Sequence, residues 1–233
     1  MTDLASELLA KFKEPSARSH QVKIGPSGIG GCPYCVGETL AHAVPEVYPD
    51  LVHVPSSSYA TWLGTMGHSG IEHEYFYDYD DRIIPAIPEG ISETKVHVYD
   101  LEGYGSISGS IDLIYKNEIF DWKFMGKFGY DKMCLAYRKD PTKIPDVTYR
   151  VQQMLYAYGA RQKGFDIERV NVVVFPKHKS SWSDVRVFTE EYNQELVDAA
   201  LDRLEKIWKI VQEGNLKDIP SSEDCYNCNN GGW

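Results

Sequence analysis

Apolar residues alternate with polar ones at a period of two through the middle of the chain, and they recur every three to four residues on either side of it. The predicted strands span 93–101, 105–115, 118–125, 170–176 and 184–189. The predicted helices span 1–15, 35–44, 59–77, 147–163 and 191–213. Helices on both sides of a block of strands predict an α/β sandwich.

Three glycines interrupt the predicted helix 59–77, at Gly64, Gly67 and Gly70. Each is less favourable than alanine in a helix interior by about 1 kcal/mol. We therefore expect this helix to pack closely against another element.

The segment 108–124 predicts a β-hairpin whose loop is Lys116-Asn117. This register places Asp112 directly opposite Asp121, and like charges in that position destabilise a hairpin. A divalent cation such as Mg²⁺ or Mn²⁺ would stabilise the pair, since both ions bind carboxylate oxygens. Lys123, on the same face as Asp121, could neutralise the pair or orient a water molecule. The alternative is an exposed face with an ordinary surface ion pair.

Alternation along 118–125 separates the aromatic residues from the charged ones. Phe120, Trp122 and Phe124 share one face, which we assign to the core, and Asp121 and Lys123 lie on the other.

The composition fits one globular domain: 233 residues, 42% hydrophobic and 25% charged. We divide this domain into an N-terminal helical region (1–58), a core (59–190) and a C-terminal helix with a tail (191–233). The chain contains no run of 18 apolar residues and no signal-peptide pattern, so we expect an intracellular protein without a membrane span.

Charge is unevenly distributed. The net charge of −10 argues against a nonspecific polyanion binder, but residues 121–179 carry +6, which leaves −16 for the rest. Cations and tyrosines alternate in this segment and predict a surface for phosphates and unpaired bases, whereas no motif for reading base sequence is present. The residues are Lys127, Lys132, Arg138, Lys139, Lys143 and Arg150, with Tyr130, Tyr137 and Tyr149. Solvated lysines and core tyrosines are the alternative.

Four of the five cysteines form two Cys-x-x-Cys pairs, Cys32 with Cys35 and Cys225 with Cys228, about 190 residues apart. Reduced thiols in such pairs predict a tetrahedral site for zinc or an iron-sulfur cluster, and the spacing within each pair is typical of zinc. We expect Cys134, which is unpaired, to be an ordinary small residue of the core or surface.

Four motifs occur in an order that resembles a known family. They are Gly64-Thr-Met-Gly-His68, Gly109-Ser-Ile-Asp112, Asp121-Trp-Lys123 and Gln152-Gln-Met-Leu-Tyr156. Together they resemble the PD-(D/E)xK nuclease superfamily and, within it, the RecB-like exonucleases, including the iron-sulfur nucleases associated with CRISPR adaptation and their phage relatives. The resemblance implies a restriction-endonuclease-like core with a central mixed sheet flanked by helices.

The resemblance also implies a role for each motif residue. His68, Asp112, Asp121 and the backbone carbonyl of Trp122 would bind Mg²⁺ or Mn²⁺, and Asp112, Asp121 and Lys123 would form the catalytic set, with Lys123 positioning or activating the attacking water. The residues expected beside the site or the substrate are Gln152, Tyr156 and Glu72. Gln153 competes with Gln152 for its role, and an ordinary salt bridge is the alternative for Glu72.

In the family, cysteines near both ends of the chain hold a [4Fe-4S] cluster. This chain departs from the common split of one plus three cysteines, because Cys32, Cys35, Cys225 and Cys228 divide two plus two. We therefore expect a [4Fe-4S] cluster that joins the ends of the chain, with structural zinc as the alternative.

The implied function is a metal-dependent DNA exonuclease acting on single-stranded or frayed ends in recombination, repair or phage DNA processing. It would work in the cytoplasm, encoded by a phage or its bacterial host, as a homo-oligomer or with a recombination partner protein. The alternatives are a structure-selective or flap endonuclease, a noncatalytic DNA-binding subunit, and a zinc-stapled protein whose Asp-x-Lys is accidental.

Overall fold

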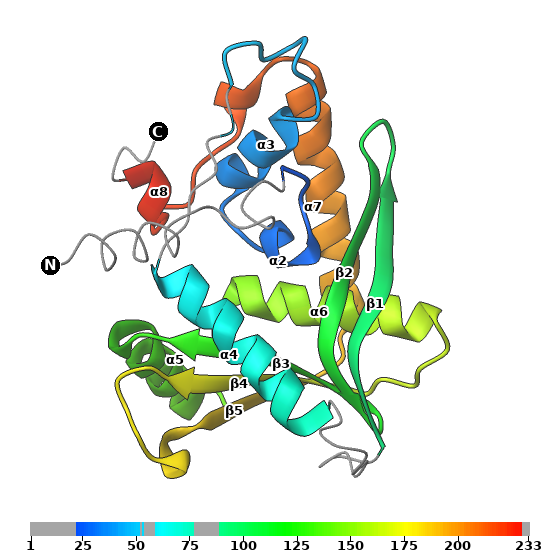
Figure 1. The fold of residues 1–233 in the computed structure, drawn as a ribbon. Coiled ribbons are helices and arrows are strands. Elements are labelled where there is room, and N and C mark those ends of the chain that lie inside the picture. Colours follow the sequence, from blue (N-terminus) through cyan, green and yellow to red (C-terminus); the bar gives the residue numbers. More distant parts are fainter. Residues whose placement is uncertain (1–21, 52, 54–58, 77–88, 230–233) are drawn as a thin grey trace, which may run out of the picture.

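The computed structural model describes residues 22–51, 53, 59–76 and 89–229, of which Figure 1 shows the arrangement. The helix predicted for residues 1–15 lies outside these described residues. The predicted internal boundaries after residues 58 and 190 stay predictions. Within the described part of the chain, no helix is both long enough and apolar enough to cross a membrane.

Five strands form one mixed sheet in the order β1-β2-β3-β4-β5, with β3 and β4 parallel and the other neighbours antiparallel. The strands are β1 (Gly90–Leu101), β2 (Gly105–Tyr115), β3 (Glu118–Met125), β4 (Arg169–Pro176) and β5 (Arg186–Glu191). The helices are α2 (Pro26–Ile29), α3 (Pro33–Ala41), α4 (Tyr59–Phe76), α5 (Lys127–Lys139), α6 (Val147–Gln162), α7 (Gln194–Gln212) and α8 (Tyr226–Asn229), with short 3-10 turns at Trp182–Asp184 and Leu216–Asp218. The predicted α/β fold with a central mixed sheet flanked by helices is confirmed.

The connection from β3 to β4 contains one helix that the sequence analysis missed. Parallel neighbours need a long crossover connection, and here α5 and α6 both lie within it (Figure 1). The stretch now seen as α5 contains good helix formers but was interpreted by its charges alone. Tyr130 and Met133 form the buried side of α5.

Helix α6 packs against the sheet, and α7 packs against α6. Each begins with a side-chain cap: Asp146 accepts a hydrogen bond from the backbone N–H of Tyr149, and Asn193 accepts one from that of Leu196, both at 3.0 Å. The buried residues of α7 recur every three to four positions, as its sequence pattern predicts. They are Val197, Ala200, Leu201, Leu204, Ile207, Trp208 and Val211.

The prediction that the aromatic face of β3 forms the core is wrong. The face that packs under α6 carries Ile119 and Asp121, which are 0% and 3% exposed, whereas Phe120, Trp122 and Phe124 are half-buried on the other face. Alternation along a strand separates two faces, but it does not say which of them is the more deeply buried.

Candidate functional site

The β2–β3 hairpin opens into a fork where its two motifs, Gly109-Ser-Ile-Asp112 and Asp121-Trp-Lys123, meet. Three residue pairs follow the predicted register, and the last is Leu113 with Phe120. The pairs nearer the loop are Ile114–Ile119 and Tyr115–Glu118. Beyond Leu113 and Phe120 the two strands are no longer paired.

The expected direct pairing of Asp112 with Asp121 is therefore not formed. The backbone N–H of Trp122 donates a hydrogen bond to Oδ2 of Asp112 at 2.7 Å, in place of a strand-to-strand bond. Splaying relieves the repulsion that two opposed carboxylates would cause. The splayed arrangement brings Asp112 beside the main chain of Trp122. Metal binding by the Trp122 carbonyl stays a prediction.

Asp121 is buried at the fork and contacts a lysine and an amide. Nζ of Lys123 lies 2.6 Å from its Oδ2, and Nε2 of Gln152 donates to its Oδ1 at 3.1 Å. Burial, with a smaller contribution from the charge of Asp112, raises the pKa of Asp121 from 3.8 to about 6 against the opposing effects of Lys123 and His68. A strongly shifted carboxyl pKa in a cleft marks a candidate functional site.

His68 reaches the fork from α4. Its Nδ1 lies 3.3 Å from Oδ2 of Asp112. Burial lowers the pKa of His68, but the hydrogen bond and charge of Asp112, together with the charge of Asp121, outweigh burial and raise it. His68, Asp112 and Asp121 are ligand types that suit a divalent metal ion, and they line one cleft with Lys123. Among the described residues, however, only the four paired cysteines bring three or more such ligand atoms within 4.8 Å of one another.

Close approach of α4 depends on one glycine. A Cβ on Gly67 would lie 2.3 Å from the ring of Phe124, whereas Gly64 and Gly70 face open space. The expected close packing of this helix is confirmed at Gly67, although the motif had singled out Gly64.

Helix α6 supplies Gln152 and Tyr156. Tyr156 lies against β2 where Gly109 has no side chain, since a Cβ there would stand 2.6 Å from Cε1 of the tyrosine. This contact gives the glycine of the Gly-x-x-Asp motif a physical reason. Gln153 is fully buried away from the cleft, and its side chain has no hydrogen-bond partner among the described residues, so Gln152 occupies the predicted position.

The candidate site lies in one cleft of about 1020 Å³. The predicted residues on its wall are His68, Glu72, Asp112, Asp121, Lys123, Gln152 and Tyr156. Lys95 of β1 and Ser27 of α2 also line it. Sequence analysis did not single them out, because no motif marks these two positions.

The four paired cysteines meet beside the same cleft, whose wall includes Cys35. Their sulfur atoms all lie within 4.8 Å of one another, and the separations given by neighbouring pairs are 3.6–3.8 Å. The site joins α3 to the segment around α8, as predicted (Figure 1). Four cysteines in this arrangement can hold a metal ion.

The thiols of Cys32 and Cys35 have pKa values shifted in opposite directions. Burial raises the pKa of Cys32, but N–H groups of Cys35 and Ser222 outweigh this effect and lower it to about 6, the Ser222 N–H donating to the sulfur at 3.2 Å. Burial and neighbouring cysteines raise the pKa of Cys35 well above its usual range. A bound metal ion would favour the thiolate form of all four.

The predicted basic surface is only partly free to meet DNA. Arg150 binds the buried carboxylate of Glu190 through Nε at 2.8 Å, so its assignment to a DNA-facing surface is wrong. The cations of α5 are exposed, and one of them, Lys127, also pairs with Asp131 at 2.9 Å; the others are Lys132, Arg138 and Lys139. Lys143 is exposed and lies 3.7 Å from Asp140.

The interleaved tyrosines point inward. Tyr130 donates to the carbonyl of Asp184 at 2.5 Å, and Tyr137 packs edge-to-face on Phe188. The ring centroid of Tyr149 lies 5.1 Å from Nζ of Lys123, so this tyrosine contacts the candidate site. Base stacking on these three rings is not supported.

No family model matches the chain, and no curated protein matches its sequence. A solved structure of an alkaline exonuclease from Laribacter hongkongensis in complex with dAMP aligns at a TM-score of 0.50 and 11% identity, over 81% of this chain and 91% of that chain. Another structure of that exonuclease aligns at a TM-score of 0.49 and 10% identity, with the same coverage. At this identity the likeness concerns the fold. The chain thus has a mixed α/β fold similar to that of a solved exonuclease.

Proposed function

We propose that this chain is a divalent-metal-dependent deoxyribonuclease that hydrolyses phosphodiester bonds at DNA ends. The convergence of Asp112, Asp121 and Lys123 at the fork, with His68 beside them, is the observation that carries this proposal. Similarity of fold to a solved exonuclease supports it at a coarse level.

The chemistry needs a nucleophilic hydroxide and neutralisation of the phosphate, and a bound Mg²⁺ or Mn²⁺ ion would supply both. Asp112, Asp121 and His68 would hold the ion. Lys123, 2.6 Å from Asp121, would position the attacking water or stabilise charge on the phosphate. Gln152 fixes the orientation of the Asp121 carboxylate through its hydrogen bond.

Preference for ends follows from the motif resemblance, as do the roles in recombination, repair or phage DNA processing, the cytoplasmic location and the partner protein. A flap endonuclease on the same scaffold is the second candidate. The complete Asp112, Asp121 and Lys123 set argues against a noncatalytic DNA-binding subunit, since such a subunit has no need of buried charges that are unfavourable without a ligand.

The test is the degradation of end-labelled linear single- and double-stranded DNA and of closed circles, in Mg²⁺, Mn²⁺ or EDTA. We expect metal-dependent loss of the linear substrates with circles intact, and Asp112→Asn should abolish it. Asp202→Asn, which alters an exposed carboxylate 2.6 Å from Lys206, is the matched control. Cleaved circles would favour the endonuclease, and binding without cleavage would favour the noncatalytic subunit.

For the four-cysteine site we propose a structural zinc ion rather than the [4Fe-4S] cluster implied by the family. Four sulfurs at about 2.3 Å from one tetrahedral ion lie about 3.8 Å apart, close to the 3.6–3.8 Å separations here. A cluster gives each of its four irons a separate thiolate and places its core between them, which needs wider spacing.

Metal analysis of protein purified without oxygen tests the assignment. We expect about one zinc per chain and no visible iron-sulfur absorbance. Iron and sulfide in a ratio near one, at about four of each per chain, would instead establish the cluster.

A further inference from the structure

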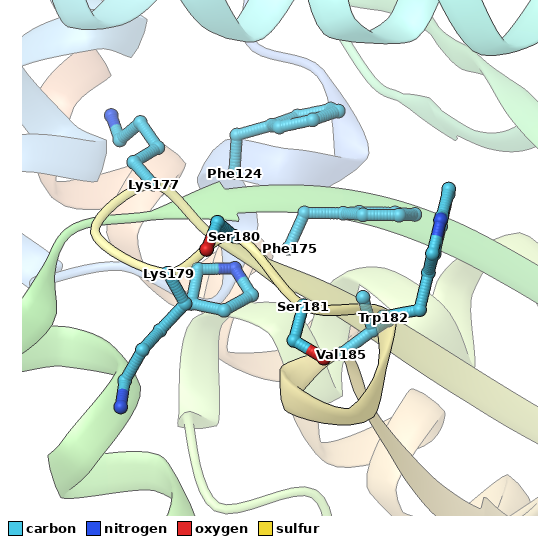
Figure 2. A pocket seen from close by; sticks show the side chains of 9 residues that line it. Phe124, Phe175, Lys177, Lys179, Ser180, Ser181, Trp182 and Val185 are labelled. Carbon is cyan, nitrogen blue, oxygen red and sulfur yellow. The ribbon is translucent and has the colours of Figure 1, made fainter.

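A second hollow lies at the C-terminal ends of the parallel strands β3 and β4 (Figure 2). It has a volume of about 260 Å³, and we call it the aromatic groove. Its lining residues are Phe124, Phe175, Pro176, Lys177, Lys179, Ser180, Ser181, Trp182 and Val185.

Three rings form the apolar part of the groove. Phe124 and Phe175 are register partners and stack with their centroids 5.0 Å apart and their planes 16° apart. Trp182 meets Phe175 edge-on at 6.4 Å, yet it is 76% exposed. An exposed indole set edge-on to a half-buried ring leaves aromatic surface available to a flat ligand.

The groove is basic in an acidic chain. Its lining includes Lys177 and Lys179 but no Asp or Glu, whereas the whole chain carries −10. In Figure 2 the lysine side chains extend from the loop away from the three rings. Aromatic faces flanked by flexible cations suit a ligand that carries both bases and phosphates.

The groove is adjacent to the catalytic cleft. Phe124 directly follows Lys123 in β3, and its side chain lies on the opposite face of the strand. The ring of Phe124 is 6.0 Å from that of His68, which in turn contacts Asp112 at 3.3 Å. A strand of DNA leaving the fork around the edge of β3 would therefore meet this groove.

We propose that the aromatic groove stacks unpaired bases of single-stranded DNA next to the phosphate that is cleaved. This inference rests on the proposed nuclease function and adds a substrate class to it. Bases paired inside a duplex cannot offer their faces to Phe175 and Trp182, so the groove distinguishes single strands and frayed ends from intact duplex. A second copy of this chain suits the groove less well, because a symmetric contact would bring the lysines of both copies together.

The test is the equilibrium binding of a fluorescein-labelled oligothymidylate and of a blunt duplex, both in EDTA so that neither is hydrolysed, measured by fluorescence anisotropy. We expect Trp182→Ala to weaken oligothymidylate binding about 5- to 150-fold, as converted from the typical free energy of stacking one base, and to change duplex binding less than 3-fold. Phe128→Ala is the control, since this residue is 83% exposed and lies outside the groove.

Lys177→Ala adds a second observable: it should reduce the slope of log affinity against log salt by about one, the contribution of roughly one phosphate contact. Thermal unfolding should be unchanged in Trp182→Ala because the side chain is exposed. Equal weakening by Phe128→Ala would assign stacking to a wider surface and overturn the proposal.

Two further outcomes separate this proposal from the nuclease function. If wild-type protein degrades DNA but Trp182→Ala binds oligothymidylate as tightly as wild type, the groove proposal fails alone. If wild type never cleaves DNA in any metal while Trp182→Ala weakens single-strand binding, the nuclease function fails and the groove stands. If Trp182→Ala dissociates an oligomer without changing DNA affinity, the groove is a self-association surface and the proposal is overturned.

Discussion

Replacing Gly67 by alanine probes how α4 holds His68 above the fork. The added Cβ would stand 2.3, 2.4 and 2.7 Å from three ring carbons of Phe124, far inside the ordinary contact distance of about 3.5–4.0 Å. The ring cannot simply swing away, since it is stacked on Phe175 at 5.0 Å. Either α4 moves off β3 or the aromatic pair is displaced.

The magnitude follows from a comparison with two neighbouring glycines. Gly64→Ala and Gly70→Ala fill open space and should each stabilise the protein by up to about 1 kcal/mol through helix propensity. Gly67→Ala gains the same propensity but adds overpacking of about 1–3 kcal/mol. The difference between Gly67→Ala and Gly64→Ala should therefore be about 1–3 kcal/mol, or roughly 2–12 °C in Tm for a chain of this size.

Urea unfolding followed by circular dichroism measures this difference, and DNA cleavage by the same variants reports whether His68 has been displaced. We expect Gly67→Ala to be the least stable and the least active of the three. Equal stability and activity of Gly67→Ala and Gly64→Ala would refute the described seating of α4 on Phe124, and with it the placement of His68.

Three other predictions concern groups outside the fork. Arg150→Met should destabilise the protein by about 3–5 kcal/mol in urea unfolding, because it leaves the buried Glu190 carboxylate without its cation. The double variant Arg150→Met/Glu190→Leu should recover most of this loss. A single variant that is as stable as wild type but binds DNA less tightly would contradict the structural role of Arg150. Burial raises the pKa of Glu38 from 4.5 to about 7, so the unfolded chain releases this proton first and stability falls as pH rises from about 4.5 to 7. Glu38→Gln should thus unfold at a higher temperature than wild type at pH 8, by up to about 3 kcal/mol in stability, but not at pH 4, and a pH-independent difference would count against this. Cys225→Ser should lose the metal bound at the four-cysteine site. Adding a chelator should therefore lower the Tm of wild type and of the control Cys134→Ser, but not the Tm of Cys225→Ser. Metal retained by Cys225→Ser would show that Cys225 is not a ligand.

Local sequence predicted much of the sheet. The bounds of β2 and β3 agree with the prediction because alternation and a two-residue loop are local features, and the loop fixed the register as far as Leu113 and Phe120. Helix α5 was missed because its residues were interpreted by charge, and its helical conformation is tied to the crossover between β3 and β4.

The sequence predicted which residues lie together in the cleft but not how they are arranged. The motifs placed Asp112, Asp121 and Lys123 on adjacent strands, but the splaying of the fork depends on the Trp122 N–H and on α4, which a strand pattern does not describe. Likewise, Arg150 could not be matched with its partner on β5, since a pairing across 40 residues leaves no local signal.

Single-turnover cleavage of end-labelled linear DNA by Lys123→Ala in saturating Mn²⁺ tests most directly the proposal that the fork is an active site. Lys206→Ala is the matched control, because Lys206 also lies 2.6 Å from an aspartate but on the exposed surface of α7. With both variants folded, as judged by thermal unfolding, we expect Lys123→Ala to cleave at least about 100-fold more slowly than wild type. Lys206→Ala should cleave at the wild-type rate. Cleavage by Lys123→Ala at the wild-type rate would contradict the assignment of the fork as the active site.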